Sequence, residues 1–342
     1  MARARRLRAG RRTNLALLAL LAGAVVTGAL SFAIGGSWVR WAVVAHGLVG
    51  LGIVALAPWK SVISARGLRR HASRRTLSFA LTASVVATVV TGIGHATGLL
   101  RTLGPVSAMQ VHVVAAVASL PLAVWHMLAH KTAPHRTDLS RRNLLRGGVV
   151  LGGAAVGYIA VEGLANVAAL PGHTRRASGS YERGSFQPVA MPVTQWLNDP
   201  VPTVDLDGWV LRIEDADGER DVGYEELFAH RHAVRAVLDC TGGWYAEQEW
   251  EGVVRSDLLR GRDQAASIEV FSLTGYVRRL PVEDAGRLLL ATRVGGRALS
   301  GGHGFPLRLV APGRRGFWWV KWVERVSLSE TPWWWQAPFP LA

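Results

Sequence analysis

Five long apolar stretches in the first half of the chain constrain its fold more than any other feature of the sequence. A helix needs about 20 residues to cross the ~30 Å hydrocarbon core of a bilayer. A core helix of a soluble protein normally keeps one polar face, and these stretches of Ala, Leu, Val and Gly have none. We therefore predict an all-α domain of five transmembrane helices over residues 1–170. The predicted spans are Asn14–Ile34, Trp41–Ala57, Leu77–Leu100, Val106–Leu128 and Val149–Leu170.

The basic residues are concentrated in the same part of the chain. The formal net charge of the 342 residues is +15, which taken alone suggests a nucleic-acid-binding protein. However, 19 of the 39 Lys and Arg residues lie in residues 1–146, where Asp138 is the one acidic residue, and the rest of the chain is slightly acidic. Basic residues gather in the cytoplasmic loops of membrane proteins. The charge therefore predicts membrane insertion and no nucleic-acid partner.

The distribution of these charges between successive loops predicts the orientation. Basic residues lie before the first apolar stretch, in residues 60–75 and in residues 131–146, whereas the alternate side carries only Arg40 and Arg101. Positively charged loops stay in the cytoplasm. With five spans, the C-terminal half is then extracytoplasmic, at the outer face of the plasma membrane.

A second signal precedes the fifth stretch. The segment Ser-Arg-Arg-Asn-Leu-Leu-Arg at residues 140–146 resembles a twin-arginine export motif. The two adjacent Arg could equally be ordinary positive residues of a cytoplasmic loop. Because twin-arginine export carries folded domains, the motif favours an outer domain whose cofactor is inserted in the cytoplasm.

Three histidines lie at one depth in the predicted membrane domain. His46, His95 and His112 stand about 8–12 Å below the outer surface, in the second, third and fourth spans. Ionisable groups inside a bilayer are costly and usually functional. Neutral imidazoles on facing helices suit the axial ligation of a haem, and the chain has no Cys-x-x-Cys-His motif, so we predict a non-covalent haem b. His46 and His112 are the preferred ligands and His95 the substitute; the alternative is that these histidines form polar contacts between helices.

The composition changes after residue 170. Residues 171–190 are rich in Gly, Ser and Arg and are predicted to be a linker. Residues 191–342 contain short alternating runs typical of strands, with a few helical segments, which predicts a β-rich α+β domain with a mixed sheet. The single cysteine, Cys240, excludes a disulfide framework and a four-cysteine zinc site.

Three blocks of this second domain combine glycine turns with chemically active side chains. Cys240 stands in Leu-Asp-Cys-Thr-Gly-Gly-Trp, where a cysteine before a Gly-Gly turn can project its sulfur into a site. The second block, Gly-Gly-His-Gly-Phe-Pro-Leu-Arg-Leu-Val, contains His303 and Arg308, and the third, Gly-Phe-Trp-Trp-Val-Lys-Trp-Val, contains Lys321. A histidine and two cations among flexible turns suit a phosphate group attached to a heterocycle.

Together with Thr-Gly-Tyr at residues 274–276, these blocks resemble the sulfite-oxidase-type molybdopterin oxidoreductase domain, over roughly residues 191–328. The resemblance implies that the Cys240 thiolate ligates molybdenum beside the pterin dithiolene, and that Tyr276 lies near the substrate as a second catalytic residue. It also implies a set of further pterin contacts: His303, Arg308, Lys321, the backbone of Trp319 and Val320, and Thr194 with Gln195.

The sequence thus predicts a membrane-bound molybdenum-cofactor-dependent oxidoreductase. It would carry out oxygen-atom or two-electron transfer on a small sulfite- or sulfoxide-like substrate. Its electrons would pass through the membrane haem, through a quinone, or through another electron-transfer protein in the membrane lipid. In layout it is similar to bacterial systems that pair such a molybdoenzyme with a membrane haem protein. Two alternatives stay open: an extracytoplasmic thiol transferase with Cys240 as nucleophile, and a non-enzymatic membrane-anchored binding protein.

Overall fold

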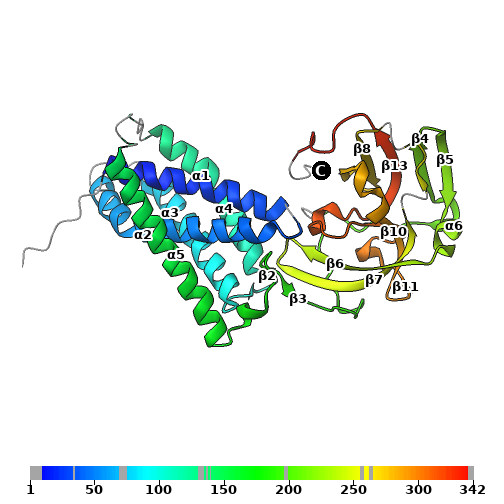
Figure 1. Ribbon diagram of the computed structural model, residues 1–342, viewed down its shortest axis with the longest axis horizontal. Helices are drawn as coiled ribbons and strands as arrows, with labels where there is room; N and C mark the ends of the chain where they lie inside the picture. Colours follow the sequence, from blue (N-terminus) through cyan, green and yellow to red (C-terminus); the bar gives the residue numbers. More distant parts are fainter. Residues whose placement is uncertain are drawn as a thin grey trace, which may run out of the picture. The chain divides into compact units, whose positions relative to one another are not determined.

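The chain divides into two units in this computed structural model (Figure 1). The first comprises residues 1–32 and 37–179, and the second comprises residues 33–36 and 180–342. The structure describes residues 10–33, 35–68, 75–129, 135, 138, 140–195, 199–254, 258–261 and 265–337. Several of the basic residues used above to predict orientation lie outside this set, as does the end of the first predicted span: Arg3 to Arg8, Arg69 to Arg74, Lys131, Arg136 and Ile34.

The described part of the first unit contains five helices that are long and apolar enough to cross a membrane, as predicted. Many of their apolar side chains are exposed; Val149 and Val167, for example, are 76% and 90% exposed. Such an apolar surface is typical of helices that face lipid. The most extensive helix–helix contacts are between α3 and α4 and between α2 and α5. The helices are α1 (Arg11–Ala33), α2 (Val39–Leu68), α3 (Arg75–Thr97), α4 (Ala108–Ala129) and α5 (Arg141–Val167).

The helix boundaries differ from the predicted spans by one to three residues at most ends, and by more at the end of α2 and the start of α5. The second span was expected to end at Ala57, but α2 continues through Pro58 into the basic segment. Proline removes one backbone donor without ending a membrane helix when neighbouring groups compensate. The fifth span was expected to begin at Val149, whereas α5 begins at Arg141, so the twin-arginine-like pair forms its first turn. An apolar run marks the part of a helix that lipid can cover, and the helical backbone extends beyond it.

Helix α4 begins where a local sequence signal places it. A short hairpin of β1 (Thr102–Leu103) and β2 (Val106–Ser107) precedes the helix. The Ser107 amide donates to Gln110 Oε1 over 2.7 Å, and the Gln110 amide donates to Ser107 Oγ over 3.1 Å. This reciprocal capping box satisfies two donors that the first turn of a helix leaves open.

The second unit consists of two mixed sheets, as predicted, with α6 (Tyr224–Ala229) and several short 3-10 turns. In the first sheet, β7 pairs with β6 along its length and with β3 and β10 at its two ends. This sheet contains β3 (Tyr181–Glu182), β6 (His232–Cys240), β7 (Trp244–Val254), β10 (Leu289–Val294), β11 (Arg297–Ala298) and β12 (Arg308–Val310). The second sheet has the order β5-β4-β13-β8-β9. Its strands are β4 (Val210–Asp215), β5 (Gly218–Gly223), β8 (Ser267–Ser272), β9 (Val277–Pro281) and β13 (Val323–Ser329).

The sequence between the two halves is more ordered than its composition suggests. Residues 171–190 were predicted to be a linker, and the division between the two units falls within them, after Gly179. They contain a 3-10 turn, η3 (Pro171–Thr174), and the strand β3, which runs parallel to the start of β7. Tyr181 of β3 is 5% exposed. This part of the chain therefore contributes to the core of the second unit.

The outer edge of the second sheet is covered by the C-terminal segment. The side-chain amide of Gln336 donates to the Arg279 carbonyl over 2.9 Å, and its Oε1 accepts the Arg279 amide over 3.0 Å. The Arg279 side chain in turn donates to the Trp335 carbonyl over 2.7 Å. The Gln336 side chain thus occupies the backbone N–H and C=O of Arg279, which a further strand would otherwise need for pairing with β9.

A substitution at Gly252 tests the register of the first sheet, because β7 and β10 are too close together at this position to leave room for a side chain. A Cβ atom at Gly252 would lie 2.0 Å from the Leu290 carbonyl oxygen. We expect Gly252→Ala to lower the free energy of unfolding by about 1–3 kcal/mol, the range typical of overpacking. The control is Gly286→Ala, because nothing lies within 4 Å of a Cβ at Gly286. Thermal unfolding in detergent measures both, and equal transition temperatures would contradict this register.

Candidate active site

The single cysteine stands at the end of a long strand, where the β6–β7 hairpin turns. Cys240 is the last residue of β6 and pairs with Trp244, the first residue of β7. The Gly243 amide donates to the Cys240 carbonyl over 3.2 Å, and the φ of Gly243, +90°, is one that favours glycine. The Gly242 amide donates to Cys240 Sγ over 3.3 Å. The hairpin therefore fixes both the position and the direction of the thiol.

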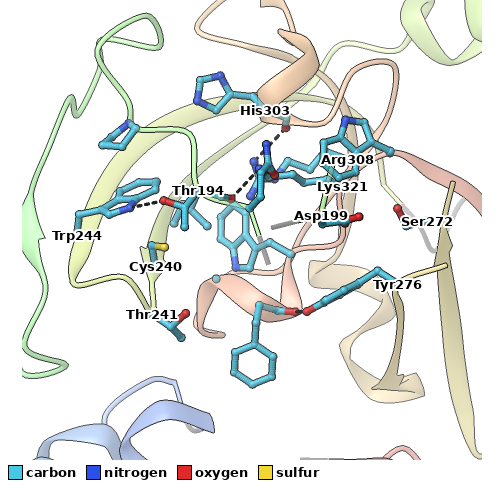
Figure 2. A pocket seen from close by; sticks show the side chains of 17 residues that line it. Thr194, Asp199, Cys240, Thr241, Trp244, Ser272, Tyr276, His303, Arg308 and Lys321 are labelled. Atoms are coloured by element: carbon cyan, nitrogen blue, oxygen red, sulfur yellow. Dashed lines mark hydrogen bonds between the residues drawn. The ribbon is translucent and has the colours of Figure 1, made fainter. Parts of the chain in front are cut away.

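The thiol lines a cavity with about 690 Å³ of empty space, including its open mouth. Figure 2 shows the sulfur of Cys240 pointing toward the middle of the labelled side chains. Burial raises the pKa of the Cys240 thiol, and the Gly242 amide, the Thr194 hydroxyl and two nearby cations oppose this shift. The protein alone therefore does not favour a free thiolate here. The labelled lining residues are Thr194, Asp199, Cys240, Thr241, Trp244, Ser272, Tyr276, His303, Arg308 and Lys321.

Arg308 brings a buried positive charge to this cavity. It is the first residue of β12 and is 2% exposed. Its Nη1 donates to the His303 carbonyl over 3.0 Å, whereas its buried Nε has no hydrogen-bond partner. The guanidinium lies 5.4 Å from the ring centre of Trp250 and 5.7 Å from that of Trp319. Burial lowers the pKa of Arg308 to about 10. An orphaned donor on a buried cation fits an anionic ligand.

Lys321 brings a second cation to the same cavity. Its Nζ donates to the Thr194 carbonyl over 2.9 Å, to Gln195 Oε1 over 2.8 Å and to the Gly302 carbonyl over 2.7 Å. Burial, followed by the charge of Arg308, lowers the pKa of Lys321 to about 7. The mutual repulsion of two buried cations is a cost that a negatively charged ligand would relieve.

His303 is held as a neutral ring beside these cations. Its Nε2 lies 3.2 Å from the Met191 carbonyl, which can only accept, so Nε2 carries the proton and Nδ1 accepts from Ser300 Oγ over 2.8 Å. Burial, together with the charges of Arg308 and Lys321, lowers the pKa of His303 to about 4. The ring therefore remains uncharged at neutral pH.

Tyr276 reaches the cavity from the second sheet, after the turn that follows β8. Its hydroxyl donates to the Phe317 carbonyl, which lies in the 3-10 turn η8 (Gly316–Trp318). Burial raises the pKa of Tyr276, so the phenol keeps its proton at neutral pH. The hydrogen bond ties the second sheet to the turn that lies behind Cys240.

The structure brings together most of the site residues expected from the sequence. Trp319 lines the cavity, and Thr194 does so while accepting the Trp244 indole N–H over 3.0 Å. Val320 is not among the lining residues; it is 1% exposed and its carbonyl accepts the Leu309 amide over 2.8 Å. The roles that the sequence assigned to these residues stay predictions.

Several residues near the site were not identified from the sequence. Asp199 lines the cavity and accepts the Thr274 hydroxyl over 2.8 Å, but no motif surrounds it. Asp239 and Arg315 form an ion pair of 2.6 Å next to Cys240. Asp239 lies within the first sequence block and Arg315 directly precedes the third. The sequence therefore shows a charged residue next to the cysteine, but only the fold shows that the two residues pair.

The first unit brings two of its three predicted haem ligands into contact. The ring centres of His46 on α2 and His112 on α4 are 5.8 Å apart, with their planes at 86°. His46 Nδ1 lies 3.0 Å from the Ala24 carbonyl, and His112 Nδ1 lies 2.7 Å from the Thr88 carbonyl. His95 is not part of this pair, since its Nε2 lies 2.8 Å from the Gly179 carbonyl. Within the described ranges, no group of three or more His, Cys, Asp or Glu could hold a metal ion.

Comparison with known proteins finds similarities to the second unit. Residues 198–335, which contain all three sequence blocks, match the family described as oxidoreductase molybdopterin binding domain. Mitochondrial sulfite oxidases from Rattus norvegicus and Homo sapiens are 28% and 27% identical over 167 residues, which cover 38% of this chain and 31% of each relative. The chain therefore spans less than a third of the length of these sulfite oxidases.

Two further proteins are similar over a comparable share of the chain. An uncharacterized oxidoreductase, YuiH, from Bacillus subtilis is 27% identical over 135 residues, covering 37% of this chain and 68% of that protein. The solved structure of the sulfane dehydrogenase SoxCD from Paracoccus pantotrophus is 23% identical, covers 38% of this chain and 40% of its own, and has a TM-score of 0.34.

The lowered pKa of Lys321 predicts how stability depends on pH in protein purified free of bound cofactor. Below about pH 7 the folded state carries the full cost of a buried charge. As the pH rises from 7 toward the ordinary value of 10.5, the folded state releases this proton first, so stability increases. Each pKa unit is worth about 1.4 kcal/mol. Lys321→Met should lack this gain, as measured by thermal unfolding between pH 7 and 10; parallel pH profiles would contradict the shift.

Proposed function

We propose that this chain, whose C-terminal unit is a molybdopterin-binding oxidoreductase domain of the sulfite oxidase type, is a membrane-bound molybdenum enzyme. It transfers an oxygen atom, or another two-electron equivalent, to or from a small sulfite- or sulfoxide-like substrate. One observation carries the proposal: a fixed, buried thiol shares a cavity with two buried cations whose pKa values are lowered, although Asp199 also lines that cavity and partly offsets the shift of Lys321.

The residues present fit this cofactor. Molybdopterin is anionic through its phosphate and its dithiolene, and the cavity offers the unpartnered Nε of Arg308 and the repelled charge of Lys321. Gln195 adds a buried Nε2 without a hydrogen-bond partner. Cys240 would ligate the metal through sulfur, while Arg308, Lys321 and His303 would hold the pterin. When bound, the cofactor supplies two-electron redox chemistry and oxygen-atom transfer, which side chains alone do not provide.

The side chains of the cavity have distinct tasks in this proposal. Trp244, Trp319 and Phe317 give the cavity large apolar surfaces that exclude water. Tyr276 keeps its proton and stays bound to the Phe317 carbonyl, so it orients this wall rather than acting as a base. A bound anion would raise the pKa of Lys321 again and keep Nζ charged as a contact for the pterin.

The thiol-transferase alternative is less well supported by the site. A nucleophilic cysteine needs a lowered pKa or an adjacent base. Here burial raises the pKa of Cys240, and His303 has both ring nitrogens occupied by Ser300 and Met191. A metal ion, in contrast, deprotonates the thiol that coordinates it. These features favour Cys240 as a ligand.

Removal of the thiol tests the assignment. We expect Cys240→Ser to lower the molybdenum content of the purified protein more than tenfold, because the metal loses its protein ligand. Elemental analysis measures this loss, and circular dichroism checks that the variant is folded. Thr241→Ser, a conservative change at the next residue, serves as the matched control. Wild-type protein without molybdenum, or a Cys240→Ser protein that keeps it, would refute the function proposed here.

We further propose that the membrane unit binds one haem b between His46 and His112, which exchanges electrons with a quinone or another membrane partner. The two rings lie close together, with their centres 5.8 Å apart, and their imidazole nitrogens would hold the haem iron. Haem and metal ligands commonly donate their other ring N–H to a carbonyl. Each of the two rings has such a carbonyl at Nδ1, and the described residues give neither Nε2 a hydrogen bond.

Glycines leave space beside both rings. A Cβ atom at Gly28 would lie 3.1 Å from His46 Cε1, and one at Gly92 would lie 2.9 Å from His112 Nδ1. These close approaches let the two histidines pack against neighbouring helices without a side chain between them. The charge asymmetry of the loops supports an outer location for the catalytic unit, and the segment beginning at Ser140 supports its export in a folded state.

Histidine variants separate the proposed axial pair from the third histidine. His46→Ala and His112→Ala should each abolish the reduced b-type absorption bands of the purified membrane protein. His95→Ala should retain them, because His95 Nε2 contacts the Gly179 carbonyl instead. Absorption spectroscopy with pyridine haemochrome quantification measures the haem. Loss of haem in His95→Ala alone, or a wild-type protein without haem, would be the contrary result.

A further inference from the structure

A buried ion pair lies directly behind the main chain of Cys240. Arg315 Nη1 donates to Asp239 Oδ1 over 2.6 Å, and the two side chains are 6% and 14% exposed. Arg315 Nη2 lies 3.5 Å from the Cys240 carbonyl. Asp239 Oδ1 also accepts the Ser180 hydroxyl over 2.6 Å, and that hydroxyl lies 3.4 Å from the same Cys240 carbonyl. Three side chains thus converge on the peptide that carries the cysteine.

The backbone around this pair leaves the cysteine no room to shift. Residues Asp239 and Arg315 form an isolated parallel bridge, although they are 76 positions apart in the sequence. At the next residue, Gly316, a Cβ atom would lie 3.1 Å from Cys240 Cα and 3.3 Å from the Asp239 carbonyl oxygen. The third sequence block therefore packs backbone to backbone against the end of β6.

The position of the pair also gives it an electrostatic role. Charges removed from water interact with their surroundings more strongly than exposed ones. A positive charge close to a metal disfavours its more oxidised, more positive state, whereas a negative charge favours that state. The charges of Arg315 and Asp239 act in opposite directions on any metal held by the Cys240 sulfur.

We propose that Arg315 and Asp239 are positioning residues for the metal ligand: their ion pair holds the Cys240 main chain in place and balances the charge that sets the midpoint potential of the molybdenum. The inference rests on the proposed function, because it assumes that Cys240 binds the metal. It assigns a task to two residues that do not line the cavity.

The neighbouring residue provides a matched control. Arg314 forms its own ion pair with a buried aspartate, Asp284, through Nη2 over 2.5 Å and Nε over 3.2 Å. Arg314 packs against Trp318 and Trp333 rather than against the cysteine. Breaking this second pair disturbs the same stretch of chain without changing the charge beside Cys240.

The experiment measures molybdenum content and midpoint potential by redox titration of the molybdenum EPR signal, with the full-length protein in detergent. Arg315→Gln leaves Asp239 unbalanced and should lower the potential, whereas Asp239→Asn should raise it. Arg315→Lys keeps the charge but not the forked geometry, so its potential should stay near the wild-type value while its molybdenum content falls. Arg314→Gln and Asp284→Asn should leave the potential unchanged.

The outcomes separate this inference from the proposed function. A wild-type protein without molybdenum overturns both. If the wild type contains molybdenum, two results overturn the inference alone. One is that Arg315→Gln and Asp239→Asn shift the midpoint potential in the same direction. The other is that Arg314→Gln shifts the potential as much as Arg315→Gln does. If Arg315→Gln is folded by circular dichroism but contains no molybdenum, while Arg314→Gln still contains it, this result supports the positioning role. The sign of the potential shift is then tested by comparing the midpoint potential of Asp239→Asn with that of Arg315→Lys.

Discussion

The burial of two cations around one thiol is the constraint on which the second unit depends. Removing a charged side chain from water costs several kcal/mol unless other groups replace the lost hydration. The fold supplies Lys321 with three oxygen acceptors, and Arg308 with one carbonyl and two indole rings. This compensation is incomplete, since the pKa of each cation is lowered and one donor of Arg308 is unpaired. An anion bound in the cavity would complete this compensation.

The two sheets contribute different parts of this arrangement. The first sheet supplies the thiol from the end of β6 and a cation from the start of β12. The second supplies Tyr276, whose hydroxyl is bound to the backbone of η8. Because η8 also packs against Cys240 through Gly316, the turn connects the two sheets at the cysteine. The unit thus fixes the position of its cysteine by backbone contacts, which few side-chain substitutions can change.

The fold and the site differ in how far the sequence predicts them. The five apolar helices follow from composition, because lipid selects for uniform apolar runs, but the ends of α2 and α5 do not, because charged residues can extend a helix into water. Cys240, Arg308 and Lys321 were identified because each stands in a local motif. The Asp239–Arg315 pair was missed, since its partners are far apart in the chain and only the packing of Gly316 against Cys240 brings them together.

The side chain of Gln336 has a consequence for the behaviour of the protein at high concentration. An uncovered edge strand is a template on which a strand of another molecule can add, and this is a common route to aggregation. Gln336 occupies both main-chain groups of Arg279 in β9, with the aromatic C-terminal segment alongside. A strand of a second molecule therefore cannot add to this sheet at Arg279, so the unit can reach a high local concentration without pairing edge to edge there.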